Sequence, residues 1–480
     1  MQCPDRVAVP AHAQGRNGHV PVKSISTHLR EARSARGWSQ PRLVRELRQV
    51  AARRGHQLPA DASVKRRIAS WENGHSTPDD FYGPLLCDTY GVTAAELGLA
   101  HGAGPDSALL DASYPASPDA AIHAVGQLWR ADLSQYEPLL EAEPSEPAWS
   151  EASLRWLVAP DPAPSQPRLG GMRVGLGDVA AVKTTADMFA QLDDQFGGDH
   201  ARHAMIQYLS NDVLPLLRGH YTEQVGRALF STVAEVTLLA GWMSYDACHH
   251  GLAQRYFLQA LRLAQDANDR RLAGSILSAM SHQATFLGRY TQAATLARAA
   301  LMGISPVATP TLRAQFHTME ARALARTGDA AACEAALSAA TRALESRNND
   351  DEPEWITYFD EAELAAEAAH CFRDVNSARQ AVSHAENAMS GSHVRSDFFA
   401  TMVLADAHLR AGDAEEACRV ALDALDLGEQ LKSARCVSYL VEFRRNLASA
   451  GSSRAARDLA EQVREHRLWV AAEAQATASL

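Results

Sequence analysis

The chain has 480 residues, of which 46% are apolar and 21% charged, and its formal net charge is −11. This composition is typical of a globular protein with about three structural units, and it excludes collagen-like and wholly disordered chains. The seven cysteines form no CxxC pair and no apolar run approaches the roughly 20 residues of a membrane span, so we expect a cytoplasmic protein.

Residues 1–22 contain Pro and Gly but no apolar core, so they are predicted to be a disordered tail and not a signal peptide. Between Lys23 and Gly74 there are twelve basic and four acidic residues, a local charge of +8 that leaves −19 for the rest of the chain. A basic module on an acidic chain is typical of a protein that binds a polyanion through one part only. The alternative is an ordinary set of solvated, arginine-rich helix faces.

Five short helices are predicted in residues 23–100. The third is capped by Asp61 or Ser63, the fourth opens at Pro78 and Thr93 caps the fifth. The third helix is cationic, and its apolar residues share one face: Val64, Ile68 and Trp71. This arrangement is what a DNA-recognition helix needs, because apolar residues dock it while long basic side chains stay free.

The motifs Leu29-Arg-Glu-Ala-Arg33, Gly37-Trp-Ser-Gln40 and Ile68-Ala-Ser-Trp-Glu-Asn-Gly74 make residues 23–100 resemble the Cro/repressor-type (XRE) family of helix-turn-helix domains. The segment from Arg48 to Ala62 is longer than is usual in that family. The resemblance implies that six side chains contact DNA: Gln40, Ser63, Lys65, Arg66, Arg67 and Ser70. A helical bundle that does not bind DNA is the alternative.

The centre of the chain carries little information about function. Residues 101–120 are rich in Gly, Pro and Ser and are predicted to be a linker. Residues 121–229 are predicted to be a helical middle segment, interrupted by an irregular stretch from Pro138 to Pro167.

A repeat follows from residue 230 to about 468. Alanines seven residues apart recur at intervals of 39 to 46 residues: Ala253/Ala260, Ala293/Ala300, Ala332/Ala339, Ala378/Ala385 and Ala417/Ala424. Seven residues are two helical turns, so each pair lies on one helix face and admits a close neighbour. The pattern resembles the tetratricopeptide class of helix-turn-helix repeats, and residues 469–480 are predicted to be a tail. The predicted fold is therefore all-α throughout.

In repeats of this class the first helix of each pair lines a concave groove. Counting back from the alanine pairs predicts the groove residues: Trp242, Tyr245, His282, His317, Asp360, Glu363, Glu367, His370 and Asp406. Three carboxylates and a histidine on one helix favour a cationic or amphipathic effector, such as a short peptide. The alternative is that these acids form a solvated helix face.

No catalytic or cofactor motif is found: there is no GxSxG elbow, no P-loop and no GxGxxG. Glu367-Ala-Ala-His370 matches the ExxH unit of di-iron bundles, but such sites need two units and the chain has one. We therefore expect neither an enzyme nor a metal or cofactor site.

The order of the two regions resembles that of actinobacterial regulators that join an XRE head to tetratricopeptide-like repeats. This resemblance implies a transcriptional regulator, a repressor or a pleiotropic regulator of development or secondary metabolism. We expect it to bind a double-stranded DNA operator as a homodimer, while the repeats sense an effector or mediate dimerisation. The alternative is an interaction scaffold whose head only localises it to DNA.

Overall fold

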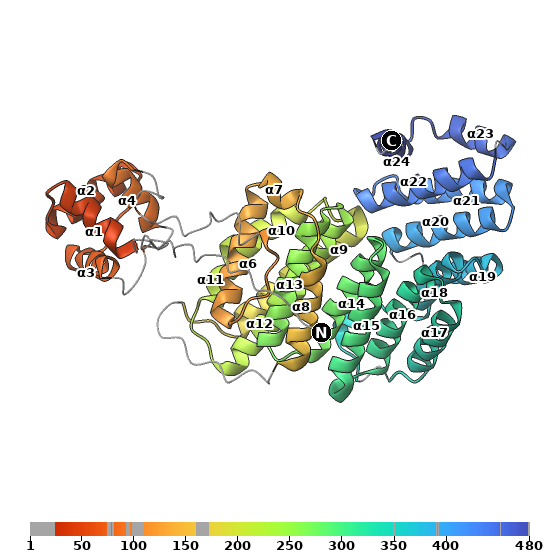
Figure 1. Cartoon of the computed structure of the whole chain (residues 1–480), viewed down its shortest axis with the longest axis horizontal. Coiled ribbons are helices and arrows are strands. Elements are labelled where there is room, and N and C mark those ends of the chain that lie inside the picture. Colours follow the sequence, from red (N-terminus) through yellow and green to blue (C-terminus); the bar gives the residue numbers. More distant parts are fainter. Residues whose placement is uncertain are drawn as a thin grey trace, which may run out of the picture. The chain divides into compact units, whose positions relative to one another are not determined.

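The computed structural model describes residues 25–73, 78, 81–92, 97, 110–159, 172–348, 351–389, 391, 393–451 and 453–478. Over these residues the protein is all-α without strands, and a single β-bridge joins Arg173 and His220. The chain divides into two compact units, residues 1–107 and 108–480 (Figure 1). The predicted tail, residues 1–22, lies outside the described residues.

The first unit contains α1 (Ile25–Ala35), α2 (Gln40–Arg53), α3 (Asp61–Glu72) and α4 (Tyr82–Tyr90). Its core is built from the apolar stripes of these helices, with members that include Leu43, Leu47, Val64, Ile68, Trp71, Leu85 and Leu86.

Two helix starts in this unit differ from the prediction. No side chain caps α3, because Ala60 precedes it and Asp61 already lies in its first turn. The fourth helix begins at Tyr82 and not at Pro78. The fifth helix, predicted after Thr93, falls outside the described residues.

The second unit begins with a helical layer that precedes the repeats. It consists of α6 (Pro118–Leu133), α7 (Glu137–Leu140), α8 (Glu146–Val158), α9 (Leu176–Phe196), α10 (Arg202–Tyr208) and α11 (Leu214–Leu217), with a π-helical turn at Leu209–Val213.

Two predictions for this region are wrong. The predicted irregular stretch from Pro138 to Pro167 contains α8, which buries Trp149 and Trp156 against the rest of the unit, and its last part, residues 160–167, lies outside the described residues. The end of the predicted linker also belongs to the folded unit, where Tyr114 is buried and donates a hydrogen bond to Gln265.

Five packed helix pairs follow, consistent with a helical repeat array. They are α12 (Glu223–Asp246) with α13 (His250–Asp266), α14 (Arg270–Phe286) with α15 (Tyr290–Ile304), α16 (Pro310–Thr327) with α17 (Ala330–Glu345), α18 (Glu361–Asp374) with α19 (Ala378–Glu386), and α20 (Val394–Arg410) with α21 (Ala414–Leu427). The first helices of successive pairs also contact one another, and the predicted alanine pairs all lie on the second helices.

The array begins and ends outside the predicted limits. Its first helix starts at Glu223 and not at residue 230. It ends with α22 (Ala434–Ser449), α23 (Arg454–Gln462) and α24 (Arg467–Ala478), so residues 469–478 are a helix and not a tail. Trp469 anchors α24, because it is buried in the same core as α22.

Gly-Asp dipeptides explain the tight turn inside two of the pairs. Gly328 and Gly412 have φ values of 80° and 89°, a left-handed conformation that glycine adopts without steric cost. The next residues, Asp329 and Asp413, then cap α17 and α21 by accepting a backbone hydrogen bond.

None of the helices in the described part of the chain has the length and apolar character needed to cross a membrane.

Candidate functional site

The third helix of the first unit has a buried face and a basic outer face. Val64, Ile68 and Trp71 are at most 4% exposed and pack in the core. Arg66 lies two residues from both Val64 and Ile68, so at 100° per residue its side chain leaves the helix on the side opposite the core. Lys65 and Arg67 on either side of it are exposed as well.

The other predicted contacts on α3 are less accessible. Ser63 and Ser70 are half-buried. The guanidinium of Arg67 lies over the ring of Tyr82, 5.4 Å from its centroid, and so it is turned towards α4. Lys65 and Arg66 are exposed on the outer side of α3. The Arg66 guanidinium lies along its own helix, where Nε donates to the Ala62 carbonyl oxygen at 3.4 Å and Nη2 to Ser63 Oγ at 3.5 Å.

Gln40 has a contact within the protein that the sequence did not predict. Its Nε2 donates to Glu72 Oε2 at 2.9 Å, although a contact with DNA was expected. Glu72 is 4% exposed and also accepts hydrogen bonds from Arg33 Nε at 2.6 Å and Arg33 Nη2 at 2.9 Å. These three residues join α1, α2 and the end of α3, and the paired charges offset the cost of burying the carboxylate.

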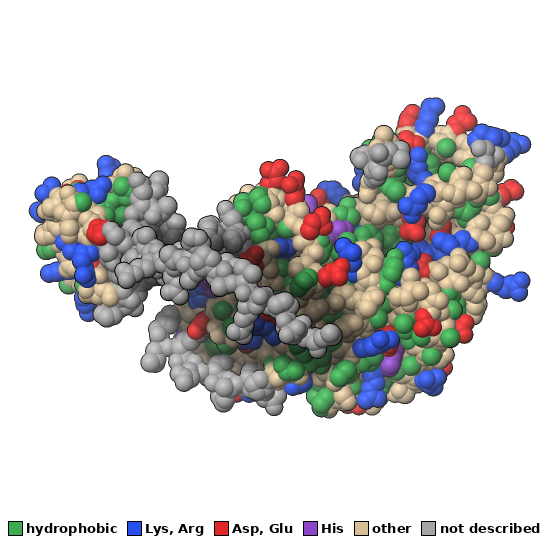
Figure 2. All heavy atoms as spheres, in the orientation of Figure 1, with side chains coloured by type: hydrophobic (Ala, Val, Ile, Leu, Met, Phe, Trp, Pro, Cys, Tyr) green, Lys and Arg blue, Asp and Glu red, His purple; other side chains and the backbone are tan. Residues whose placement is uncertain are grey.

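The long connection between α2 and α3 is held by Arg48. Its Nε forms an ion pair with Asp61 Oδ1 at 2.5 Å, and its Nη1 donates to the carbonyl oxygen of Leu58 at 3.3 Å. The start of α3 is therefore tied to α2 by one side chain, just as its end is tied by Glu72. Figure 2 shows mainly Lys and Arg side chains among the charged groups on the visible face of this unit.

In the second unit, four predicted groove residues meet in an inner cluster: Tyr245, His282, Glu367 and His370. Two residues that were not predicted, Arg322 and Tyr439, belong to the same cluster. The Tyr245 hydroxyl lies 3.1 Å from His282 Nδ1, and His282 Nε2 lies 3.9 Å from Glu367 Oε1. Glu367 also forms an ion pair with Arg322. The cluster therefore draws on α12, α14, α16 and α18, the first helices of four successive pairs.

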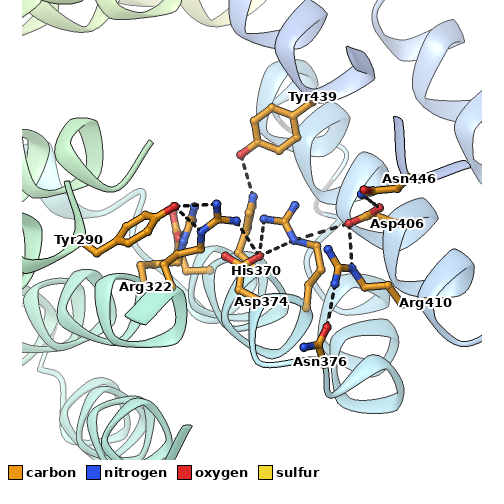
Figure 3. Close-up of polar contacts among 12 residues, drawn as sticks. Tyr290, Arg322, His370, Asp374, Asn376, Asp406, Arg410, Tyr439 and Asn446 are labelled. Atoms are coloured by element: carbon orange, nitrogen blue, oxygen red, sulfur yellow. Dashed lines mark hydrogen bonds and ion pairs between the residues drawn. The ribbon is translucent and has the colours of Figure 1, made fainter. Parts of the chain in front are cut away.

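His370 and Tyr439 complete the inner cluster (Figure 3). His370 Nδ1 lies 2.9 Å from the carbonyl oxygen of Ala366, and its Nε2 lies 2.9 Å from the Tyr439 hydroxyl. A carbonyl oxygen can only accept, so Nδ1 carries the proton and Nε2 accepts from Tyr439. Burial, and then the charge of Arg322, hold the pKa of His370 well below its usual value, so the imidazole is neutral.

The acids predicted to line the groove do not form a free acidic face. Asp360 caps α18, because its Oδ1 accepts from the backbone N–H groups of Ala362 and Glu363. Asp406 accepts from Asn446 at 2.7 Å and from Arg410 at 3.2 Å (Figure 3).

The environment of Glu363 favours the protonated form of its carboxyl group. Burial, and then the charges of Glu367 and Asp360, raise its pKa to about 8. Glu367 is paired with Arg322, so its negative charge is already neutralised and is not free to attract a cationic effector.

The remaining predicted groove residues lie at the edge of the inner cluster or away from it. The half-buried Trp242 packs edge-on against His282, with ring centroids 5.5 Å apart. His317 lies beside Glu320 of its own helix, with 3.7 Å between His317 Nδ1 and Glu320 Oε2.

The sequence analysis missed the basic and hydroxyl partners of these acids and histidines. Arg322 lies on α16, one residue away from a counted groove position. Arg435, Tyr439 and Asn446 lie on α22, which follows the last repeat in which groove positions were counted. Groove positions counted in the same way on the next helix would have indicated α22. The partners of the individual acids and histidines, however, depend on how the helices pack.

Comparisons with protein-family models and with curated proteins find no match to this chain. Within the described residues, no group of three or more His, Cys, Asp or Glu side chains is arranged to hold a metal ion.

Proposed function

We propose that the protein is a DNA-binding transcriptional regulator. Its first unit binds a double-stranded operator through α3, as an XRE-type helix-turn-helix domain, and its tetratricopeptide-like body senses an effector or mediates dimerisation. The single observation that carries the proposal is the geometry of α3, whose apolar face is buried while Lys65 and Arg66 are exposed on the opposite side.

Three physical features support α3 as the base-reading element. Glu72 and Arg48 tie its two ends to α1 and α2, so the helix is held firmly as it enters a groove. Arginine forms paired hydrogen bonds with guanine in the major groove, and Arg66 points in the direction such a contact needs. The local charge of +8 attracts the phosphate backbone, while the acidic body is repelled by it.

The half-buried position of Gln40 and its bond to Glu72 give it a positioning role in this proposal. It fixes the start of α2 relative to the end of α3. The base contacts are accordingly assigned to Lys65 and Arg66, with Ser63 and Ser70 beside them.

The proposal is tested by selection from a pool of random-sequence DNA duplexes with the full-length protein. We expect recovery of one motif, in two inverted half-sites about one helical turn apart if the regulator is a dimer. Recovery of a single half-site would retain DNA recognition and contradict the dimer. Recovery of random sequences would contradict base reading altogether.

A further inference from the structure

The repeat array of the second unit contacts itself end to end. In a helical repeat array each pair normally contacts only its neighbours. Here α20 contacts α9, and α22 contacts α12, the first helix of the array. We call this contact the closure; it joins residues 193–198 and 246 on one side to residues 393–395 and 432–435 on the other.

Opposite charges face each other across the closure. Arg395 Nη2 lies 2.8 Å from Asp193 Oδ2, and Arg395 Nη1 lies 3.7 Å from Asp246 Oδ2. Arg435 Nη1 lies 3.9 Å from Asp246 Oδ1. At the edge, His393 Nδ1 lies 2.8 Å from Asp194 Oδ2. The carboxylates named here all lie on the α9 and α12 side, and the basic groups on the α20 and α22 side.

Arg435 also links the closure to the inner cluster. Its guanidinium lies between two aromatic rings, 4.4 Å from the centroid of Tyr245 and 4.6 Å from that of Phe399. The side chain is 7% exposed, and its Nε has no hydrogen-bond partner. Tyr245 is the same residue that contacts His282, so a movement of Arg435 would expose the inner cluster on that side.

The backbones meet closely at the closure. The Lys432 N–H donates to the Phe196 carbonyl oxygen at 2.7 Å. A Cβ atom on Gly198 would lie 2.5 Å from the Met243 carbonyl oxygen, and one on Gly197 would lie 2.6 Å from that of Lys432. Glycine is therefore required for the loop after α9 to fit between α12 and the start of α22.

The closure differs chemically from the contacts between neighbouring pairs. Neighbouring helices pack through apolar residues, in one large core between residues 112 and 359 and another between 369 and 472. A smaller apolar cluster between residues 321 and 407 connects the two cores along the array. At the closure the two ends meet mainly through charged groups. For buried ion pairs the cost of desolvation nearly cancels the attraction, and separated charges regain their water. Separating the closure therefore costs less free energy than separating the apolar packing between neighbouring pairs.

We propose that the second unit is a clamp that opens reversibly at the closure, and that the ion pairs of Arg395 and Arg435 with Asp193 and Asp246 hold it shut. Opening separates α9 and α12 from α20 and α22 and exposes the surface around Tyr245. The clamp concerns the second unit alone, so its test is independent of DNA binding.

Hydrogen exchange of the Lys432 amide in the full-length protein reports opening directly, because this amide donates across the closure. We expect Arg395→Gln to accelerate exchange in residues 430–436 at least about tenfold, while α14 to α17 keep their protection and helix content is unchanged. Arg419→Gln is the matched control, since it removes an arginine from an exposed ion pair on α21.

Two further measurements keep the proposal testable if Arg395→Gln folds poorly. Gly198→Ala should accelerate hydrogen exchange of the amides of residues 430–436 without removing a charge. Raising the salt concentration should do so in the unaltered protein, because ions favour the solvated, separated charges. The clamp is contradicted if residues 430–436 exchange at the unaltered rate under all three conditions. Loss of protection throughout the array would equally overturn it, because the closure would then be an ordinary part of the core.

Discussion

At the residue scale, a buried carboxylate joins three helices of the first unit. Glu72 is the last residue of α3, and its contacts with Arg33 and Gln40 decide how that helix is presented. Glu72→Gln keeps the size of the side chain but removes the ion pair, so it should destabilise the first unit by about 2 kcal/mol. Hydrogen exchange of the α3 amides measures this loss of stability. The control is Glu46→Gln on the surface, where Glu46 Oε1 lies 3.8 Å from Arg42 Nε, and it should change the stability by less than about 0.5 kcal/mol.

Glu363 should make the stability of the second unit depend on pH. Its pKa is raised to about 8 in the folded protein but lies near 4.3 in an unfolded chain. The folded state then binds more protons between about pH 5 and 8, so ionisation of Glu363 lowers stability as the pH rises through this window.

Glu363→Gln should therefore gain stability relative to the unaltered protein as the pH rises from 5 to 8, on the order of 3 kcal/mol. Chemical denaturation at both pH values measures the difference. The exposed Glu361→Gln, on the same helix, should show no such trend. A gain from Glu363→Gln that is the same at both pH values would show that the carboxyl is already ionised.

The burial or exposure of a single side chain could be predicted where helical periodicity determines it. Contacts between side chains on different helices could not be predicted, because they depend on packing. The outer position of Arg66 follows from the spacing of Val64, Ile68 and Trp71 alone. The pairing of Gln40 with Glu72 joins residues 32 positions apart. No local pattern indicates such a contact, because it depends on how α2 and α3 cross.

At the element scale, the repeats were predictable because small residues recur at a helical period. Within the middle segment, which was predicted to be helical, α8 was missed because prolines suggested irregular chain, although Pro147 lies in the first turn of α8, where its missing N–H costs nothing. The helix at the end of the chain was likewise missed, because its contacts are with α22 and follow no repeat.

The contact between α8 and α15 provides a test at this scale. A Cβ on Gly303 would lie 1.9 Å from the ring of Trp156, so Gly303→Ala should destabilise the second unit by about 1–3 kcal/mol. Thermal denaturation measures the change. Met302→Ala, next to it in sequence and 68% exposed, should have almost no effect. An equally small effect of Gly303→Ala would mean that α8 does not pack on α15 in solution.

At the scale of the whole molecule, the net charge of −11 conceals two parts of opposite character. The first unit carries the basic excess, and in the second unit acids and arginines pair within and across the repeats. From one helix at a time, the acids are predicted to face either a cationic or amphipathic effector or the solvent, because their partners lie on other helices. The end-to-end closure could not be predicted, since it joins residues about 200 positions apart.

The central claim is that α3 reads DNA bases through Arg66. The most direct measurement compares the affinity of the full-length protein for its selected duplex and for a scrambled duplex, at one fixed salt concentration. The unaltered protein should prefer the selected duplex by at least about 10³-fold. Arg66→Ala should lose about 1–3 kcal/mol of that preference, while Arg53→Ala, exposed in the last turn of α2, should keep it. Equal affinity of the unaltered protein for both duplexes would contradict the account.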